Sequence, residues 1–133
     1  MASIRREISI LAPADQLWSA LCDVGALHTR LVPGFVTECQ WDGEGRDVTF
    51  VNGVKARELI IDVDDASRRV AWTAVGGRLS HHNASAQVFA EGPAACRVVW
   101  IADLLPHEMA PPIASMIEAG LAAMKRHAER PAG

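Results

Sequence analysis

The feature that most constrains the fold is an amphipathic segment near the end of the chain, from Glu108 to Glu129. Its apolar residues recur at intervals of three and four, which places them on one side of an α-helix. They are Met109, Ile113, Met116, Ile117, Leu121, Met124 and Ala128. Because such a helix is stable only when its apolar side is covered, the preceding part of the chain must supply a matching surface. Pro111 and Pro112 fit only the first turn of a helix, so we expect the helix to begin near them.

Most of the chain before this helix has the pattern of short β-strands. Ile4, Ile8 and Ile10 alternate with polar residues, as in a half-buried strand. Later runs with β-strand character cover residues 35–41, 47–51, 54–63, 68–75, 79–90 and 94–105. The turns between them, such as Asn52-Gly53, are short, and short connections join antiparallel neighbours. The runs therefore predict a meander, and the first strand completes a seven-stranded antiparallel sheet that its twist curves into a grip.

Two short helices are expected between the first and second strands. Pro13 suits the first turn of a helix, the residues that follow it form an apolar face, and Gly25 is placed to end it. A second short helix or turn is expected over residues 26–32.

Composition restricts the class of protein. The 133 residues are 50% hydrophobic and 22% charged, which predicts a single globular domain over residues 1–133. The net charge is −3 with acids and bases interleaved, so we expect no nucleic-acid partner. We find no signal-peptide pattern and no apolar run of about 18 residues, so we expect a cytoplasmic protein without membrane insertion. Both a monomer and a homodimer are compatible with the sequence.

Sequence motifs predict neither a metal nor a cofactor. Cys22, Cys39 and Cys96 are odd in number and widely spaced, which is typical of reduced thiols rather than of a metal site. The nucleotide-binding, serine-hydrolase and zinc-protease motifs are absent from the sequence.

The predicted order of elements resembles the helix-grip fold of the SRPBCC superfamily, which includes START domains, birch-pollen-type allergens and bacterial polyketide cyclase/dehydrase-like proteins. Three segments resemble the last group: ILAPADQLWSAL, ARELIIDVDDASRRVAW and VVWIADLLP. The resemblance implies an α+β fold with a hydrophobic cavity between sheet and helix. Different members use this cavity to bind lipids, hormones or polyketides, and a few use it for cyclisation, dehydration or condensation.

The hairpin that turns at residues 64–67 predicts part of the cavity wall. If the strands are regular, Leu59 and Ile61 share the apolar face with Trp72, because side chains alternate along a strand. Glu58 then faces outward. A shift of the register by one residue would reverse this assignment.

The next hairpin predicts a second part of the wall. His82, Ala84 and Ala86 lie opposite Trp100 on the better interior face, where small alanines beside a large indole leave room. His81 and Asp103 belong to the other face, which we expect to be solvated, although a register slip would bring them inside as an acid–base group.

On the last helix, Met116, Gly120 and Met124 are further candidates for ligand contact. The methionines suit either a plain core or a pocket that adapts to irregular apolar shapes. Gly120 costs about 1 kcal/mol relative to Ala in a helix, and it is explained either by close helix–sheet contact or by space above a ligand.

His82 is the polar residue with the widest range of roles. An imidazole among apolar neighbours has a lowered pKa and is neutral at pH 7, so it can act as a base or donate to a carbonyl. The alternative is a core histidine that bonds a backbone group. His82, His81 and Asp103 are therefore tentative catalytic residues.

Two functions of different classes remain, and a third is weaker. The first is the binding of a small hydrophobic or aromatic molecule, oriented by groups such as His82 and Trp100. The second is a cofactor-free polyketide cyclase/dehydratase-type enzyme in which His82, or the His81 and Asp103 face, moves a proton. The third is a protein-interaction module. We favour binding, because the sequence offers one plausible cavity base but no nucleophile, metal or oxyanion site.

Overall fold

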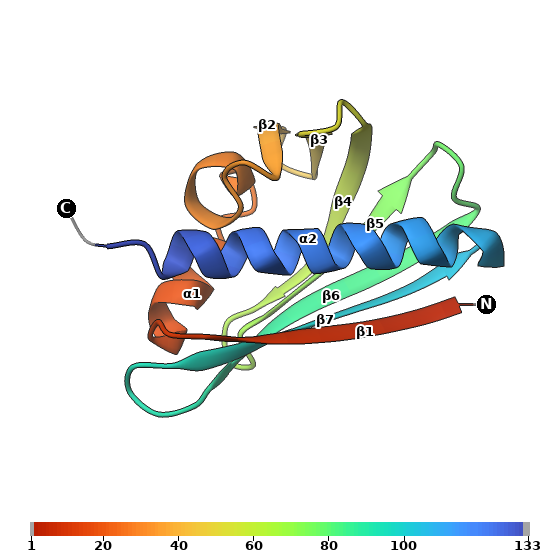
Figure 1. The fold of residues 1–133 in the computed structure, drawn as a ribbon. Coiled ribbons are helices and arrows are strands. Elements are labelled where there is room, and N and C mark those ends of the chain that lie inside the picture. The colour runs from red at the N-terminus through yellow and green to blue at the C-terminus, as the bar shows by residue number, and fades with distance from the viewer. Residues whose placement is uncertain (1, 132–133) are drawn as a thin grey trace.

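A computed structural model describes residues 2–131 of the protein (Figure 1). Its elements in chain order are β1 (Ala2–Ile10), α1 (Ala14–Leu21), the π-helix η1 (Leu27–Leu31), β2 (Val36–Trp41), β3 (Gly45–Phe50), β4 (Lys55–Asp64), β5 (Arg69–Val75), β6 (His81–Ala90), β7 (Cys96–Leu105), the 3-10 helix η2 (His107–Met109) and α2 (Ala110–Ala128). The strands form one antiparallel seven-stranded sheet in the order β1-β7-β6-β5-β4-β3-β2. The predicted α+β helix-grip fold is confirmed, as are the two short helices and the start of the last helix near Pro111.

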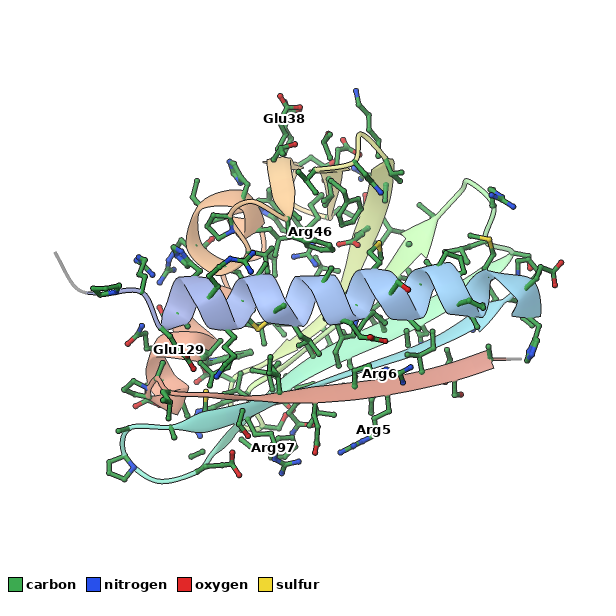
Figure 2. All side chains as sticks on the ribbon, in the orientation of Figure 1. Arg5, Arg6, Glu38, Arg46, Arg97 and Glu129 are labelled. Carbon is green, nitrogen blue, oxygen red and sulfur yellow. The ribbon has the colours of Figure 1, made fainter. Side chains whose placement is uncertain are left out.

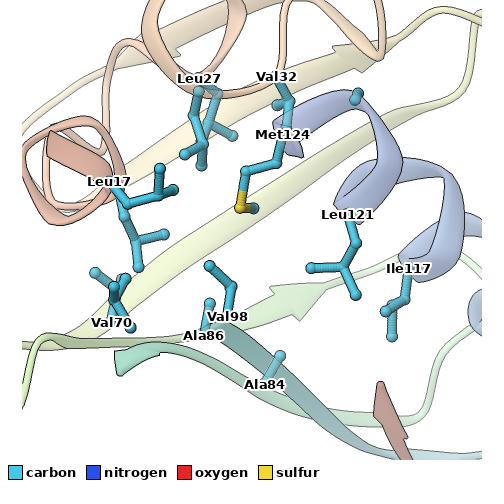
Figure 3. Packing of buried hydrophobic residues seen from close by; sticks show 14 of the residues in the cluster. Leu17, Leu27, Val32, Val70, Ala84, Ala86, Val98, Ile117, Leu121 and Met124 are labelled. Carbon is cyan, nitrogen blue, oxygen red and sulfur yellow. The ribbon is translucent and has the colours of Figure 1, made fainter. Parts of the chain in front are cut away.

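The long helix α2 lies across one face of the curved sheet, and α1 and η1 lie near its C-terminal end (Figure 1). Ile117, Leu121 and Met124 of α2 are buried in the same cluster as Ala86 and Val98 of the sheet (Figure 3). The apolar stripe that the sequence places on this helix is therefore covered by the sheet, which is where most of its stability originates. No helix within residues 2–131 is both long and apolar enough to span a membrane.

A β-bulge in β4 changes the face to which its side chains point. Ile60 pairs with Trp72, but the next paired residue of β4 is Asp62, opposite Ala71, so Ile61 is an extra residue without a partner. An extra residue in one strand reverses the faces to which the side chains on one side of the bulge point, relative to those in an unbroken strand. The register of β4 therefore differs on the two sides of Ile61.

This bulge overturns the predicted placement of two residues. Leu59 and Ile61 do not share the inner face with Trp72, and Ile61 is 59% exposed. Glu58, which regular alternation points outward, instead shares the inner face with Trp72 and is only 9% exposed. The sequence-based assignment is wrong at these positions because it assumed an unbroken strand.

The hairpin of β6 and β7 has the predicted faces. His82 pairs with Leu104, Ala84 with Ala102, and Ala86 with Trp100. The two alanines of β6 are buried on the side that faces α2.

The register slip that would have brought the other face of this hairpin inside does not occur. His81 is exposed, and Asn83 pairs with Asp103 on the outer face of the sheet. The Asp103 carboxylate accepts a hydrogen bond from the hydroxyl of Ser3, on the neighbouring strand β1.

Candidate functional site

A cavity of about 310 Å³ lies between the sheet and the N-terminal half of α2. Strands β4, β5 and β6, the loop between β5 and β6, and α2 all contribute to its lining. Its apolar walls include Trp72, Trp100, Met109, Ile113, Met116 and Ile117. A cavity of this size is at the lower end of the range that holds small organic ligands.

A smaller cavity of about 50 Å³ continues from the first one towards α1 and η1. The two cavities share Glu58, Trp72, Trp100 and Met116 among their lining residues. Of the other predicted ligand contacts, Ala86 and Met124 line the smaller cavity. Ala84 is buried in the core beside Trp72.

The two tryptophans form one aromatic wall. The ring centroids of Trp72 and Trp100 are 5.7 Å apart, and their planes meet at 64°, an edge-to-face arrangement. Such pairs are favourable beyond the area they bury. Trp18 is not among the residues that line the two cavities, and its indole N–H donates a hydrogen bond to Asp65 at 2.5 Å.

Gly120 is explained by close packing of α2 against this wall. A Cβ atom at Gly120 would lie 2.8 Å from Cζ3 of Trp100 and 3.1 Å from Cε2 of Phe35. Both distances are shorter than an unstrained contact between carbon atoms. The space above Gly120 is therefore filled by protein side chains, which corresponds to the first of the two explanations that the sequence allowed.

His82 holds its imidazole in one tautomer. Its Nδ1 accepts a hydrogen bond from the backbone N–H of Ala74 at 2.9 Å, so the neutral ring carries its proton on Nε2. Burial lowers the pKa of His82; the carboxylate of Glu58 acts in the opposite direction, and His81 lowers the pKa further. The side chain lines the larger cavity, and within residues 2–131 the hydrogen bond of its ring is the one that Nδ1 accepts from Ala74. The group that this histidine can present to a ligand is a donor.

Arg46 and Glu58 form a buried ion pair, and sequence reasoning missed both as candidate site residues. Glu58 lines both cavities, and Arg46 lines the smaller one. Nε of Arg46 donates to Oε1 of Glu58 at 2.8 Å, and Nη1 donates to the carbonyl oxygen of Val24 at 3.1 Å. The guanidinium carbon also lies 5.6 Å from the ring centroid of Trp72, in cation–π contact. Figure 2 shows Arg46 in the space between β3 and α2.

A signal for this pair is present in the sequence. Arg46 shares the parity of Val48 and Phe50, which are buried in β3, and it pairs directly with Glu58 of β4. An arginine on the apolar face of one strand calls for a carboxylate opposite it, because a buried charge without a partner is costly. The sequence thus indicates that Arg46 needs a carboxylate opposite it, and the pairing of β3 with β4 in the structure identifies that carboxylate as Glu58.

The other tentative catalytic residues do not join this site. His81 and Asp103 belong to the outer face of the sheet, so they lie on the opposite side from the cavity that His82 lines. In the described part of the chain, no group of three or more His, Cys, Asp or Glu side chains is arranged to hold a metal ion.

A curved antiparallel sheet that closes over a long helix around an apolar cavity defines a helix-grip protein. Residues 1–129 match the family described as polyketide cyclase / dehydrase and lipid transport, and the chain belongs to that family. A comparison with curated proteins gives no significant match.

Solved structures share the fold at low sequence identity. A protein from Thermobifida fusca is 27% identical with a TM-score of 0.77, and the match covers 98% of this chain and 93% of that one. Norcoclaurine synthase from Thalictrum flavum is 20% identical with a TM-score of 0.76, covering 98% and 95%. The di-domain ARO/CYC BexL, from the BE-7585A biosynthetic pathway, is 16% identical with a TM-score of 0.83; the match covers 97% of this chain but 47% of BexL.

Proposed function

We propose that the protein binds a small apolar or aromatic molecule in the 310 Å³ cavity beneath α2. The observation that carries this proposal is the wall formed by Trp72 and Trp100 in edge-to-face contact, with the flexible side chain of Met116 beside it. Burial of apolar area supplies most of the affinity in such a site, and a few polar groups set the orientation.

His82 is the group that orients the ligand. The residue lines a largely apolar cavity, where a hydrogen bond from its Nε2–H to a ligand oxygen is stronger than it is in water. Norcoclaurine synthase, which shares the fold, has been solved in complex with dopamine and hydroxybenzaldehyde, two small aromatic molecules. Its example supports an aromatic ligand for this cavity.

The enzymatic alternative stays a prediction. In the neutral ring, the basic nitrogen of His82 already accepts the N–H of Ala74, so it is not free to take a proton from a substrate. This geometry favours hydrogen-bond donation over general-base catalysis. We therefore favour ligand binding over enzymatic activity as the function of the cavity.

Tryptophan fluorescence tests the binding proposal. Because Trp72 and Trp100 both line the cavity, flat aromatic molecules that do not absorb at the excitation wavelength should change the emission in a saturable way. A panel of such molecules, toluene among them, that leaves the emission unchanged would contradict the proposal.

Two substitutions on the same strand provide the control. Ala74 lines the cavity, so Ala74→Phe should occupy part of it and weaken binding by roughly tenfold or more, equivalent to about 1.4 kcal/mol. Ala71 points to the outer face, where it pairs with Ser85 and Asp62, so Ala71→Phe should leave the affinity almost unchanged. Equal effects of the two substitutions would place the binding site elsewhere.

A further inference from the structure

We propose that Glu58 makes this cavity selective for a neutral ligand that carries a hydroxyl group, such as a phenol or an enol, over one that carries a carboxylate. This inference rests on the proposed function and names the chemical class of the ligand.

The two members of the buried ion pair, Arg46 and Glu58, do not line the same cavities. Glu58 lines both the large and the small cavity, whereas Arg46 lines only the small one. Oε1 of Glu58 receives the bond from Arg46 at 2.8 Å, and no protein group within residues 2–131 donates to its Oε2. A ligand in the large cavity therefore meets the carboxylate and not the guanidinium.

A carboxylate in this position requires a hydrogen-bond donor. Glu58 is 9% exposed, so water reaches it little, and hydrogen bonds to charged groups are stronger than those between neutral groups. A ligand hydroxyl supplies the missing donor to Oε2. A ligand carboxylate supplies none, and at short range it is repelled by a charge of the same sign.

The basic residues around the cavity do not offset this repulsion. Arg57 is one of the lining residues, but its guanidinium forms ion pairs with Asp42 at 2.8 Å and with Asp47 at 3.3 Å, which compensate its charge. Lys55 and Arg78 are exposed at the rim, where water and salt screen their charges.

Three probes of one shape test the inference by isothermal titration calorimetry on the wild-type protein: naphthalene, 2-naphthol and 2-naphthoate. We expect 2-naphthol to bind about tenfold more tightly than naphthalene, the gain of one hydrogen bond to a charged acceptor. We expect 2-naphthoate to bind at least about tenfold more weakly than 2-naphthol. Equal affinities for naphthalene and 2-naphthol, or tight binding of 2-naphthoate, would overturn the inference and leave the proposed function intact. If none of the three binds, the proposed function itself fails.

A double substitution shows whether Glu58 is the source of the preference. Removing Glu58 alone leaves Arg46 buried without a partner, which is strongly destabilising, whereas apolar replacement of both partners is often tolerated. We therefore expect Arg46→Met/Glu58→Leu to fold and to bind naphthalene and 2-naphthol within about threefold of each other, whatever its absolute affinity for naphthalene. If the double variant keeps the tenfold preference for 2-naphthol, another group supplies it and the inference is wrong.

Discussion

His82 shows how one backbone contact determines the chemistry of a side chain. The N–H of Ala74 occupies Nδ1 of the imidazole, which assigns the proton of the neutral ring to Nε2. Protonation of the ring would remove this acceptor, and burial of the ring disfavours the charged form, so the pKa lies below its ordinary value of 6.5. The neutral donor form is therefore the one that the folded protein stabilises.

The lowered pKa of His82 makes stability depend on pH in a defined window. Above the ordinary pKa of 6.5, the histidine is neutral in both the folded and the unfolded chain, and it contributes nothing. As the pH falls below 6.5, the unfolded chain takes up a proton before the folded one does, so the free energy of unfolding decreases. The decrease ends below the folded-state pKa, where both states are protonated.

Urea unfolding at about pH 7.5 and about pH 5.5 measures this effect. The comparison is with His82→Asn, whose side-chain oxygen can still accept the N–H of Ala74 but does not titrate. We expect the wild type to lose more stability than the variant between the two pH values. The lowered pKa of His127 affects both proteins alike, so an equal loss in the two would show that His82 is not responsible.

At the scale of elements, α2 approaches the sheet closely at one position. Gly120 is buried on α2, directly against the ring of Trp100. Glycine has a lower helix propensity than alanine, but its lack of a side chain allows α2 to pack directly against the indole ring of Trp100.

Gly120→Ala is expected to destabilise the protein although alanine is the better helix former. Helix propensity favours the substitution by about 1 kcal/mol, but a methyl group 2.8 Å from Trp100 forces the ring or the helix to move, and overpacking costs about 1–3 kcal/mol. We expect a net loss of about 1 kcal/mol in the free energy of unfolding, measured by urea denaturation.

Ala119→Gly on the exposed side of the same helix is the matched control. It should cost about 1 kcal/mol through propensity alone. A gain in stability from Gly120→Ala would show that α2 and Trp100 are less closely packed than the structure indicates.

At the scale of the whole molecule, the cavity and the core are parts of one assembly. Ile117 and Met124 of α2 are buried in the core, and they also line the large and the small cavity respectively (Figure 3). A ligand beneath α2 would contact the same helix that closes the core, so its binding should stabilise the fold as a unit.

Thermal unfolding with and without a bound aromatic molecule tests this coupling. A ligand at about 100 times its Kd stabilises the folded state by about 2.7 kcal/mol, which corresponds to an increase in Tm of roughly 10 °C for a chain of this length. We expect this increase for a molecule identified by fluorescence, and a much smaller one for Ala74→Phe at the same concentration. A ligand that changes the emission without raising Tm would contradict binding in the cavity of the folded state.

The sequence by itself determined the elements, their order and the family. Strand and helix periodicities are local properties of the sequence, and strands joined by short turns pair antiparallel. The seven strands and α2 could therefore be predicted without coordinates. The inward placement of His82, Ala86 and Trp100 followed from the same alternation, because β6 and β7 pair without a bulge.

Only the tertiary structure decided the chemistry of the cavity wall. The bulge at Ile61 has no clear local signature in an apolar run. It nevertheless places Ile61 in an exposed position and Glu58 on the inner face of the sheet. The tautomer of His82 depends on Ala74 of the neighbouring strand, and the reason for Gly120 depends on a ring from β7. Periodicity specifies which face of an element is apolar, but contacts between elements determine which polar groups enter the interior and what they can bind.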